Sequence, residues 1–121
     1  MPGILWEKQA LTLDRDCDGL NDRAYFGRFK GRIFVGFASG TGSKVDLLEF
    51  SVNPNVQAAI CSEPAKLEVE SLDVDPTKSI GKVDGFVRSK TCQGLRLSGG
   101  GCDAIHIFWN RKTKSLNWWR L

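Results

Sequence analysis

Short segments rich in β-branched and aromatic residues, each followed by glycine or other turn-forming residues, recur along most of the chain. Such segments favour β-strands, and the glycines between them allow the tight reversals that antiparallel pairing needs. The first three strands are expected over residues 24–29, 32–38 and 44–50, with reversals at residues 30–31 and 39–43. This arrangement predicts an antiparallel meander.

The second half of the chain continues the same pattern. Strict alternation over residues 66–72 places Leu67 and Val69 on one face of a strand. Further strands are expected over residues 85–88, 93–97, 103–109 and 115–119, the last two joined by a hairpin loop over residues 110–114. A capping Asn53 followed by Pro54 predicts one short helix over residues 54–60.

These elements together predict a mainly β fold. About seven or eight short strands with little helix are typical of a small antiparallel barrel or sandwich. A length of 121 residues indicates a single domain, residues 1–121.

Residues 14–22 carry aspartates at the spacing of a calcium-binding loop. Carboxylates at the first, third and fifth loop positions can converge on one hard cation while the chain turns at Gly19. The seventh position would add a backbone carbonyl, and the ninth would bind directly or through water. The predicted ligands are therefore Asp14, Asp16, Asp18, the carbonyl of Leu20, and Asp22. We expect calcium in a structural role.

The loop differs from an EF-hand, because Tyr25 stands at the twelfth position and a strand-like sequence follows. The pattern DxDxDGxxD followed by strands resembles the calcium loop of FG-GAP and VCBS repeats and of thrombospondin type 3 repeats. This resemblance covers roughly a quarter of the chain and implies the loop but no propeller, since single blades do not stand alone. The chain also resembles small exported bacterial proteins of unknown function, through this loop and the closing residues 102–120, which implies no activity.

The chain contains four cysteines, Cys17, Cys61, Cys92 and Cys102. An even number in a short chain fits two disulfides formed in an oxidising compartment, and three pairings can be drawn. A Cys92–Cys102 bridge across the glycines at 99–101 would close a hairpin and leave Cys17 and Cys61 to hold the Asp-rich loop. The amino-terminal residues lack the features of a secretory signal, so a secreted or periplasmic location requires that a signal was removed. The alternative is a cytoplasmic protein with reduced cysteines.

Charge and hydropathy limit the partners that this chain can have. The net charge of +3 is small and the basic residues are mixed with acidic ones, so no nucleic-acid partner is expected. No apolar run approaches the roughly 18 residues of a membrane-spanning helix, so membrane insertion is not expected either.

The closing strand pair carries the predicted binding residues. Trp118 and Trp119 are adjacent and point to opposite faces of a strand, so one of them is expected at the surface. There it could stack on a sugar ring or anchor a protein partner. The predicted binding residues are Trp118, Trp119, Arg111 and Arg120.

No catalytic residue is predicted. His106 is the only histidine, and its place in an alternating strand fits a surface or packing role. The chain contains no GxSxG, P-loop, HExxH or dinucleotide-binding motif. Glu68 and Glu70 share one face of a strand at a spacing that two-carboxylate hydrolysis could use, but any alternating acidic strand looks the same.

The sequence therefore favours a non-enzymatic exported or periplasmic binding or inhibitor module, with a structural calcium loop and a protein or carbohydrate partner. One alternative is a cytoplasmic immunity or accessory protein that binds a protein toxin. A second alternative is a small hydrolase that uses His106.

Overall fold

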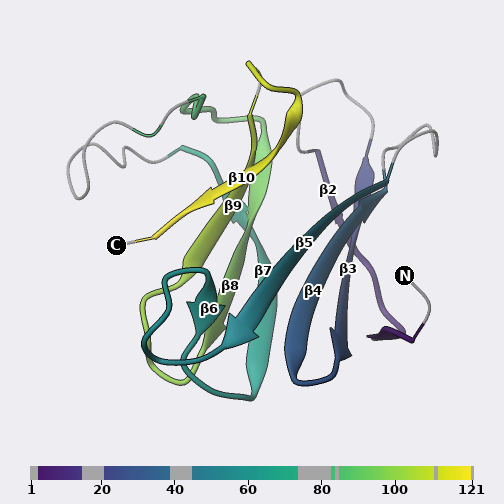
Figure 1. Cartoon of the computed structure of the whole chain (residues 1–121). Helices are drawn as coiled ribbons and strands as arrows, with labels where there is room; N and C mark the ends of the chain where they lie inside the picture. Colours follow the sequence, from purple (N-terminus) through teal and green to yellow (C-terminus); the bar gives the residue numbers. More distant parts are fainter. Residues whose placement is uncertain are drawn as a thin grey trace.

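The strands of this protein form two sheets. The computed structural model describes residues 3–14, 21–38, 45–73, 83, 85–110 and 112–120. The first sheet has the order β1-β3-β4-β5-β6, with β2 also paired with β3, and the second has the order β10-β9-β8-β7 (Figure 1). The strands of the first sheet are β1 (Leu5–Trp6), β2 (Leu11–Leu13), β3 (Asp22–Phe29), β4 (Arg32–Ala38), β5 (Val45–Val52) and β6 (Ala59–Ile60). Those of the second are β7 (Ala65–Ser71), β8 (Gln93–Gly99), β9 (Ile105–Asn110) and β10 (Ser115–Trp119).

The predicted meander is confirmed. Strands β3, β4 and β5 pair antiparallel in chain order, as do β7, β8, β9 and β10. The first reversal uses Lys30 and Gly31, whose φ angles are 50° and 74°. A two-residue hairpin loop with both residues at positive φ matches the right-handed twist of its strands, and glycine reaches this region without steric cost.

One hydrophobic core fills the space between the two sheets. On β4, the alternating residues Ile33, Val35 and Phe37 face inward, and Leu95 and Leu97 on β8 meet them from the other sheet. Neither sheet closes on itself, so the molecule has the two-sheet arrangement of a sandwich and not that of a barrel. Among the described residues, no helix is long and apolar enough to cross a membrane.

The helix predicted over residues 54–60 is wrong. The Asn53 side chain accepts a hydrogen bond from the amide of Asn55 at 2.9 Å, which makes a local turn in place of a helix cap. The chain then enters β6, where Ala59 and Ile60 are buried and pair in parallel with the end of β5. Burial in the sheet outweighs the weak helical preference of this short segment.

The strand predicted over residues 85–88 is also wrong. Residues 85–90 are irregular, and Phe86 packs edge-to-face on Phe108 with ring centroids 5.3 Å apart. This segment covers part of the outer face of the second sheet, with Leu72 and Cys92 in the same small apolar cluster. Side-chain packing therefore holds these residues where no strand ladder does.

A disulfide joins the two sheets near one end. Cys61 follows β6, Cys102 lies between β8 and β9, and their Cα atoms are 5.7 Å apart. The predicted Cys92–Cys102 bridge is therefore wrong. The glycine turn folds over the chain at Cys61, so closely that a Cβ on Gly100 would lie 2.9 Å from the Cβ of Cys61. Cys92 is also disulfide-bonded, and its partner lies outside the described residues.

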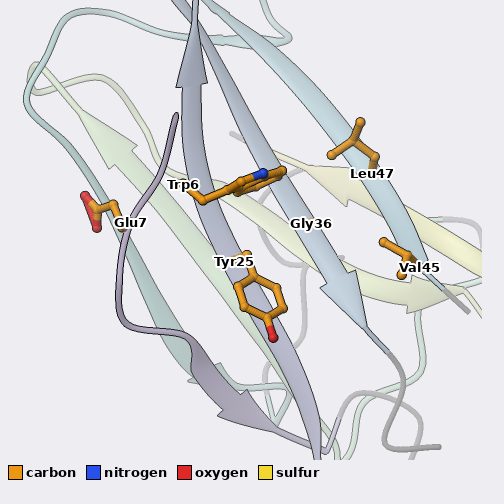
Figure 2. Close-up of a pocket in the computed structure, with 6 residues that line it drawn as sticks. All are labelled: Trp6, Glu7, Tyr25, Gly36, Val45 and Leu47. Carbon is orange, nitrogen blue, oxygen red and sulfur yellow. The ribbon is translucent and has the colours of Figure 1, made fainter. Parts of the chain in front are cut away.

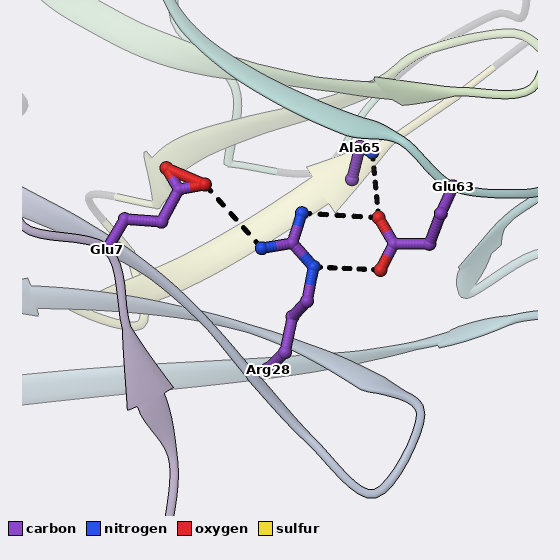
Figure 3. A network of polar contacts seen from close by, with 4 residues as sticks. All are labelled: Glu7, Arg28, Glu63 and Ala65. Atoms are coloured by element: carbon purple, nitrogen blue, oxygen red, sulfur yellow. Dashed lines mark hydrogen bonds and ion pairs between the residues drawn. The ribbon is translucent and has the colours of Figure 1, made fainter.

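An arginine on β3 makes a second link between the sheets. The Nε and Nη2 atoms of Arg28 donate to the two carboxylate oxygens of Glu63 at 2.8 and 3.2 Å, just before β7 (Figure 3). The carboxylate of Glu7 lies 3.5 Å from Nη1 of the same guanidinium. These hydrogen bonds hold the pKa of Glu63 below its ordinary value and raise the pKa of Arg28.

Candidate functional site

The outer face of the first sheet carries an incomplete row of side chains. The strand register sets Tyr25 beside Gly36, and Gly36 beside Leu47, so the three residues lie across β3, β4 and β5 on one face. Because Gly36 has no side chain, the middle of this row leaves space above the backbone of β4 for a side chain from another strand. The row therefore has a glycine floor between an aromatic and an aliphatic side chain.

Trp6 on the short strand β1 forms one side of this opening. The backbone of Trp6 pairs with Gly27, and its indole lies over β3 and β4 (Figure 2). A Cβ added to Gly27 would lie 2.7 Å from Cε3 of the indole, and one added to Gly36 would lie 3.2 Å from Cη2. The two glycines thus leave the space in which the indole edge sits, and the Tyr25 ring packs edge-on to it at 6.4 Å.

Together these residues line a groove of about 440 Å³. Its lining consists of Trp6, Glu7, Tyr25, Gly36, Val45 and Leu47. Val45 and Leu47 are 71% and 43% exposed and Trp6 is 40% exposed, so large apolar side chains face solvent. Glu7 lies on the far side of Trp6 from Leu47 (Figure 2), and its carboxylate contacts Arg28. The groove has the size of a ligand site and is mostly apolar.

This groove was not predicted from the sequence. No motif of the sequence includes Trp6, and Tyr25 enters only as the residue that departs from the EF-hand pattern. A signal was nevertheless present, because Gly27 and Gly36 interrupt strand sequences, and a glycine inside a strand often marks a close approach by another part of the chain. Which part approaches depends on how β1 pairs, and its short segment does not reveal that.

The described part of the Asp-rich loop stands at its base. Asp14 follows β2 and Asp22 begins β3, where Leu13 pairs with Asp22. The amide of Asp14 donates to the Gln93 side chain at 3.2 Å, and its carbonyl accepts from the Gln93 amide at 2.8 Å, so the loop base is attached to β8. Asp22 is 1% exposed.

The other predicted ligands, Asp16, Asp18 and Leu20, lie outside the described residues, as does Cys17. Within the described ranges no three His, Cys, Asp or Glu residues gather into a group that could hold a metal ion. The calcium loop therefore stays a prediction.

The predicted binding residues on β10 have contacts inside the molecule. Trp118 packs against the core and meets Phe50 edge-on at 5.9 Å, whereas Trp119 stacks on His106 at 4.2 Å. Arg120 donates to the backbone carbonyls of Gln57 and Ala59 at 3.0 and 2.7 Å. Arg111 lies outside the described residues. Trp118 and Trp119 point to opposite faces, as expected, but both are half-buried.

His106 is held on the outer face of the second sheet. Its Nδ1 lies 2.8 Å from the Glu70 carboxylate, and its ring is stacked on Trp119. Next to it, Arg96 contacts Glu68 at 3.4 Å. These contacts orient the imidazole within a cluster of side chains from neighbouring strands.

Comparison with known proteins finds no match. No family model, no curated protein and no solved structure is similar to this chain.

Proposed function

We propose that this protein is a non-enzymatic, exported binding module whose binding surface is the groove beside Trp6. The observation that carries the proposal is the groove itself: exposed tryptophan, valine and leucine side chains and a half-buried tyrosine converge around Gly36. Small soluble domains rarely leave such residues together in solvent unless a partner covers them. The Cys61–Cys102 disulfide supports export, because disulfides persist in oxidising compartments.

The groove selects its ligand by shape and apolar contact. The polar side-chain groups that line the groove are the Tyr25 hydroxyl and the carboxylate of Glu7, which already contacts Arg28. A sugar needs several polar partners around an aromatic ring, whereas an apolar side chain needs mainly contact area. Of the protein and carbohydrate partners that the sequence allows, a protein side chain is therefore the better fit.

A titration with a side-chain analogue tests the binding surface. We expect p-cresol to shift the indole N–H resonance of Trp6 more than those of the other three tryptophans, with the Trp6 signal assigned from a Trp6→Phe variant. Leu47→Lys should abolish the shift, because it places a charge at the groove wall. Val87→Lys is the matched control, since Val87 is 46% exposed and does not line the groove. Equal shifts at all four indoles, or an unchanged response of Leu47→Lys, would contradict the proposal.

The same proposal gives the Asp-rich loop a structural calcium ion. Two facts support it: the first and ninth loop positions lie at the base of one hairpin connection, and four aspartates within nine residues repel one another without a cation. The ion would tie β2 to β3 beside the attachment to Gln93.

Calcium is therefore expected to raise the melting temperature of chelator-treated protein. At ten times its dissociation constant, the ion would stabilise the fold by about 1.4 kcal/mol, or on the order of 5 °C for a domain of this size. Asp22→Asn removes a ligand charge with little change in shape and should reduce the calcium-dependent rise. Identical melting curves in chelator and in millimolar calcium would exclude the ion.

A further inference from the structure

Among the described residues, β5 has an edge that is only partly paired, and this edge lies directly beside the groove. Along residues 45–50, β5 pairs with β4 on one side, and β6 covers only Ser51 and Val52 on the other. The amides of Ser51 and Asn53 point toward β6, since they donate to the carbonyls of Ala58 and Ile60 at 3.2 and 2.8 Å.

The orientation of these two amides determines which way the backbone N–H and C=O groups of the preceding β5 residues point. The β4–β5 register is continuous from Val45 to Phe50, so backbone groups alternate sides without a bulge. Val45, Leu47 and Glu49 therefore direct their N–H and C=O groups away from β4, toward the open edge. Among the described residues, no strand and no loop backbone bonds to these groups.

This edge has little of the protection that exposed edges usually have. Natural sheets block an edge with proline, charged side chains, a bulge or a very short strand. Strand β5 is eight residues long, holds no proline and no lysine, and presents Val45 and Leu47 to solvent on its outer face. Its two charged residues are Asp46 and Glu49. Glu49 is the charged residue on that face, and it pairs with Arg32 across the hairpin.

We infer that β5 receives an extended segment of a protein partner as an added strand. This inference rests on the proposed function and names the partner's form. The added strand would satisfy the backbone groups of Leu47 and Glu49 and extend the row formed by Tyr25, Gly36 and Leu47 by one side chain. An apolar residue opposite Leu47, with reach toward the groove, would bury Val45 and Leu47.

A second copy of this chain fits the edge less well. In antiparallel pairing of two β5 strands, the register that sets Val45 against Leu47 also sets Asp46 against its own copy. The register centred on Leu47 sets Val45 against Glu49. Like charges directly opposite, or a charge against an apolar side chain, disfavour both arrangements. A heterologous strand with apolar residues at alternate positions has neither conflict.

The probe is a panel of fluorescein-labelled seven-residue peptides in which leucine or phenylalanine alternates with threonine between terminal lysines. Each is also made with N-methyl groups on one alternating set of backbone amides or on the other set. We expect anisotropy to detect binding, and one methylated set to weaken it by about tenfold or more while the other set has little effect. Only the set whose amides face β5 loses hydrogen bonds.

Variants of the protein give the complementary test. Leu47→Pro removes an amide that faces the open edge and leaves the β4–β5 ladder intact, so it should abolish peptide binding with the circular dichroism spectrum retained. Val87→Lys should bind as the unmodified protein does.

Three results would overturn strand addition. The first is binding that survives both methylated sets, which would leave groove binding and the proposed function standing. The second is a response to p-cresol without binding of any peptide in the panel. The third is a concentration-dependent dimer, seen by light scattering, that Leu47→Pro abolishes. Failure of the p-cresol titration itself would instead contradict the proposed function.

Discussion

The two glycines under Trp6 have unequal steric room. A Cβ on Gly27 would lie 2.7 Å from both Cε3 of Trp6 and Cγ2 of Ile4, and 3.1 Å from the Leu5 carbonyl oxygen. A Cβ on Gly36 would meet only Cη2 of Trp6 at 3.2 Å and side-chain atoms farther away. The first position is therefore closed by β1 as a whole, while the second is limited by one ring that can move slightly.

This difference predicts an order of stability. Gly27→Ala should lower the free energy of unfolding by about 1–3 kcal/mol, because β1 must shift to admit the methyl group. Gly36→Ala should cost much less, since alanine also favours an extended strand over glycine. Urea unfolding followed by circular dichroism measures both. If Gly36→Ala is as destabilising as Gly27→Ala, then β1 does not pack on Gly27 in this way.

At the scale of elements, local signals predicted the hairpins and long-range pairing decided the rest. The Lys30-Gly31 reversal and the hairpin around residues 110–114 were predictable because the turn residues and the flanking alternation lie within a few positions of each other. The parallel pairing of β6 with β5 was not, because a two-residue strand has no pattern of its own. Asn53 was predicted to cap a helix, but its side chain accepts a hydrogen bond that closes a local turn instead.

The two candidate sites, the Asp-rich loop and the groove, also differ in whether the sequence predicts them. The Asp-rich loop was visible because its ligands are close in sequence, although most of it lies outside the described residues. The groove was not visible, because Trp6, Tyr25 and Leu47 come from β1, β3 and β5 and meet only through two successive registers and the edge pairing of β1. Alternation predicts which face a residue occupies, but it does not predict which strand lies beside it.

At the scale of the whole molecule, the two sheets are joined by an ionic contact as well as through the core. Arg28 belongs to the first sheet, and Glu63 immediately precedes the second, so their bidentate contact links the two sheets (Figure 3). Glu63 also accepts a hydrogen bond from the Ala65 amide at 2.8 Å, which fixes the start of β7. Both charged side chains are about two-fifths exposed, at 38% and 41%, so solvent weakens their attraction.

This contact predicts how stability depends on pH. The pKa of Glu63 is lower in the folded protein than in the unfolded chain, chiefly because Arg28 donates hydrogen bonds to the ionised carboxylate. The folded state therefore binds the proton less readily, and the contribution of Glu63 is fully present above its ordinary pKa of 4.5 and lost as the pH falls through the lowered value. The free energy of unfolding of Glu63→Gln should lie below that of the unmodified protein at pH 7, by less than about 1 kcal/mol, and the gap should close toward pH 3. Urea unfolding at several pH values measures the gap.

Glu7→Gln is the matched control, because Glu7 contacts the same guanidinium at 3.5 Å and should show a smaller gap at pH 7. A gap for Glu63→Gln that is constant or widens on acidification would mean that Arg28 does not hold the two sheets together through this carboxylate.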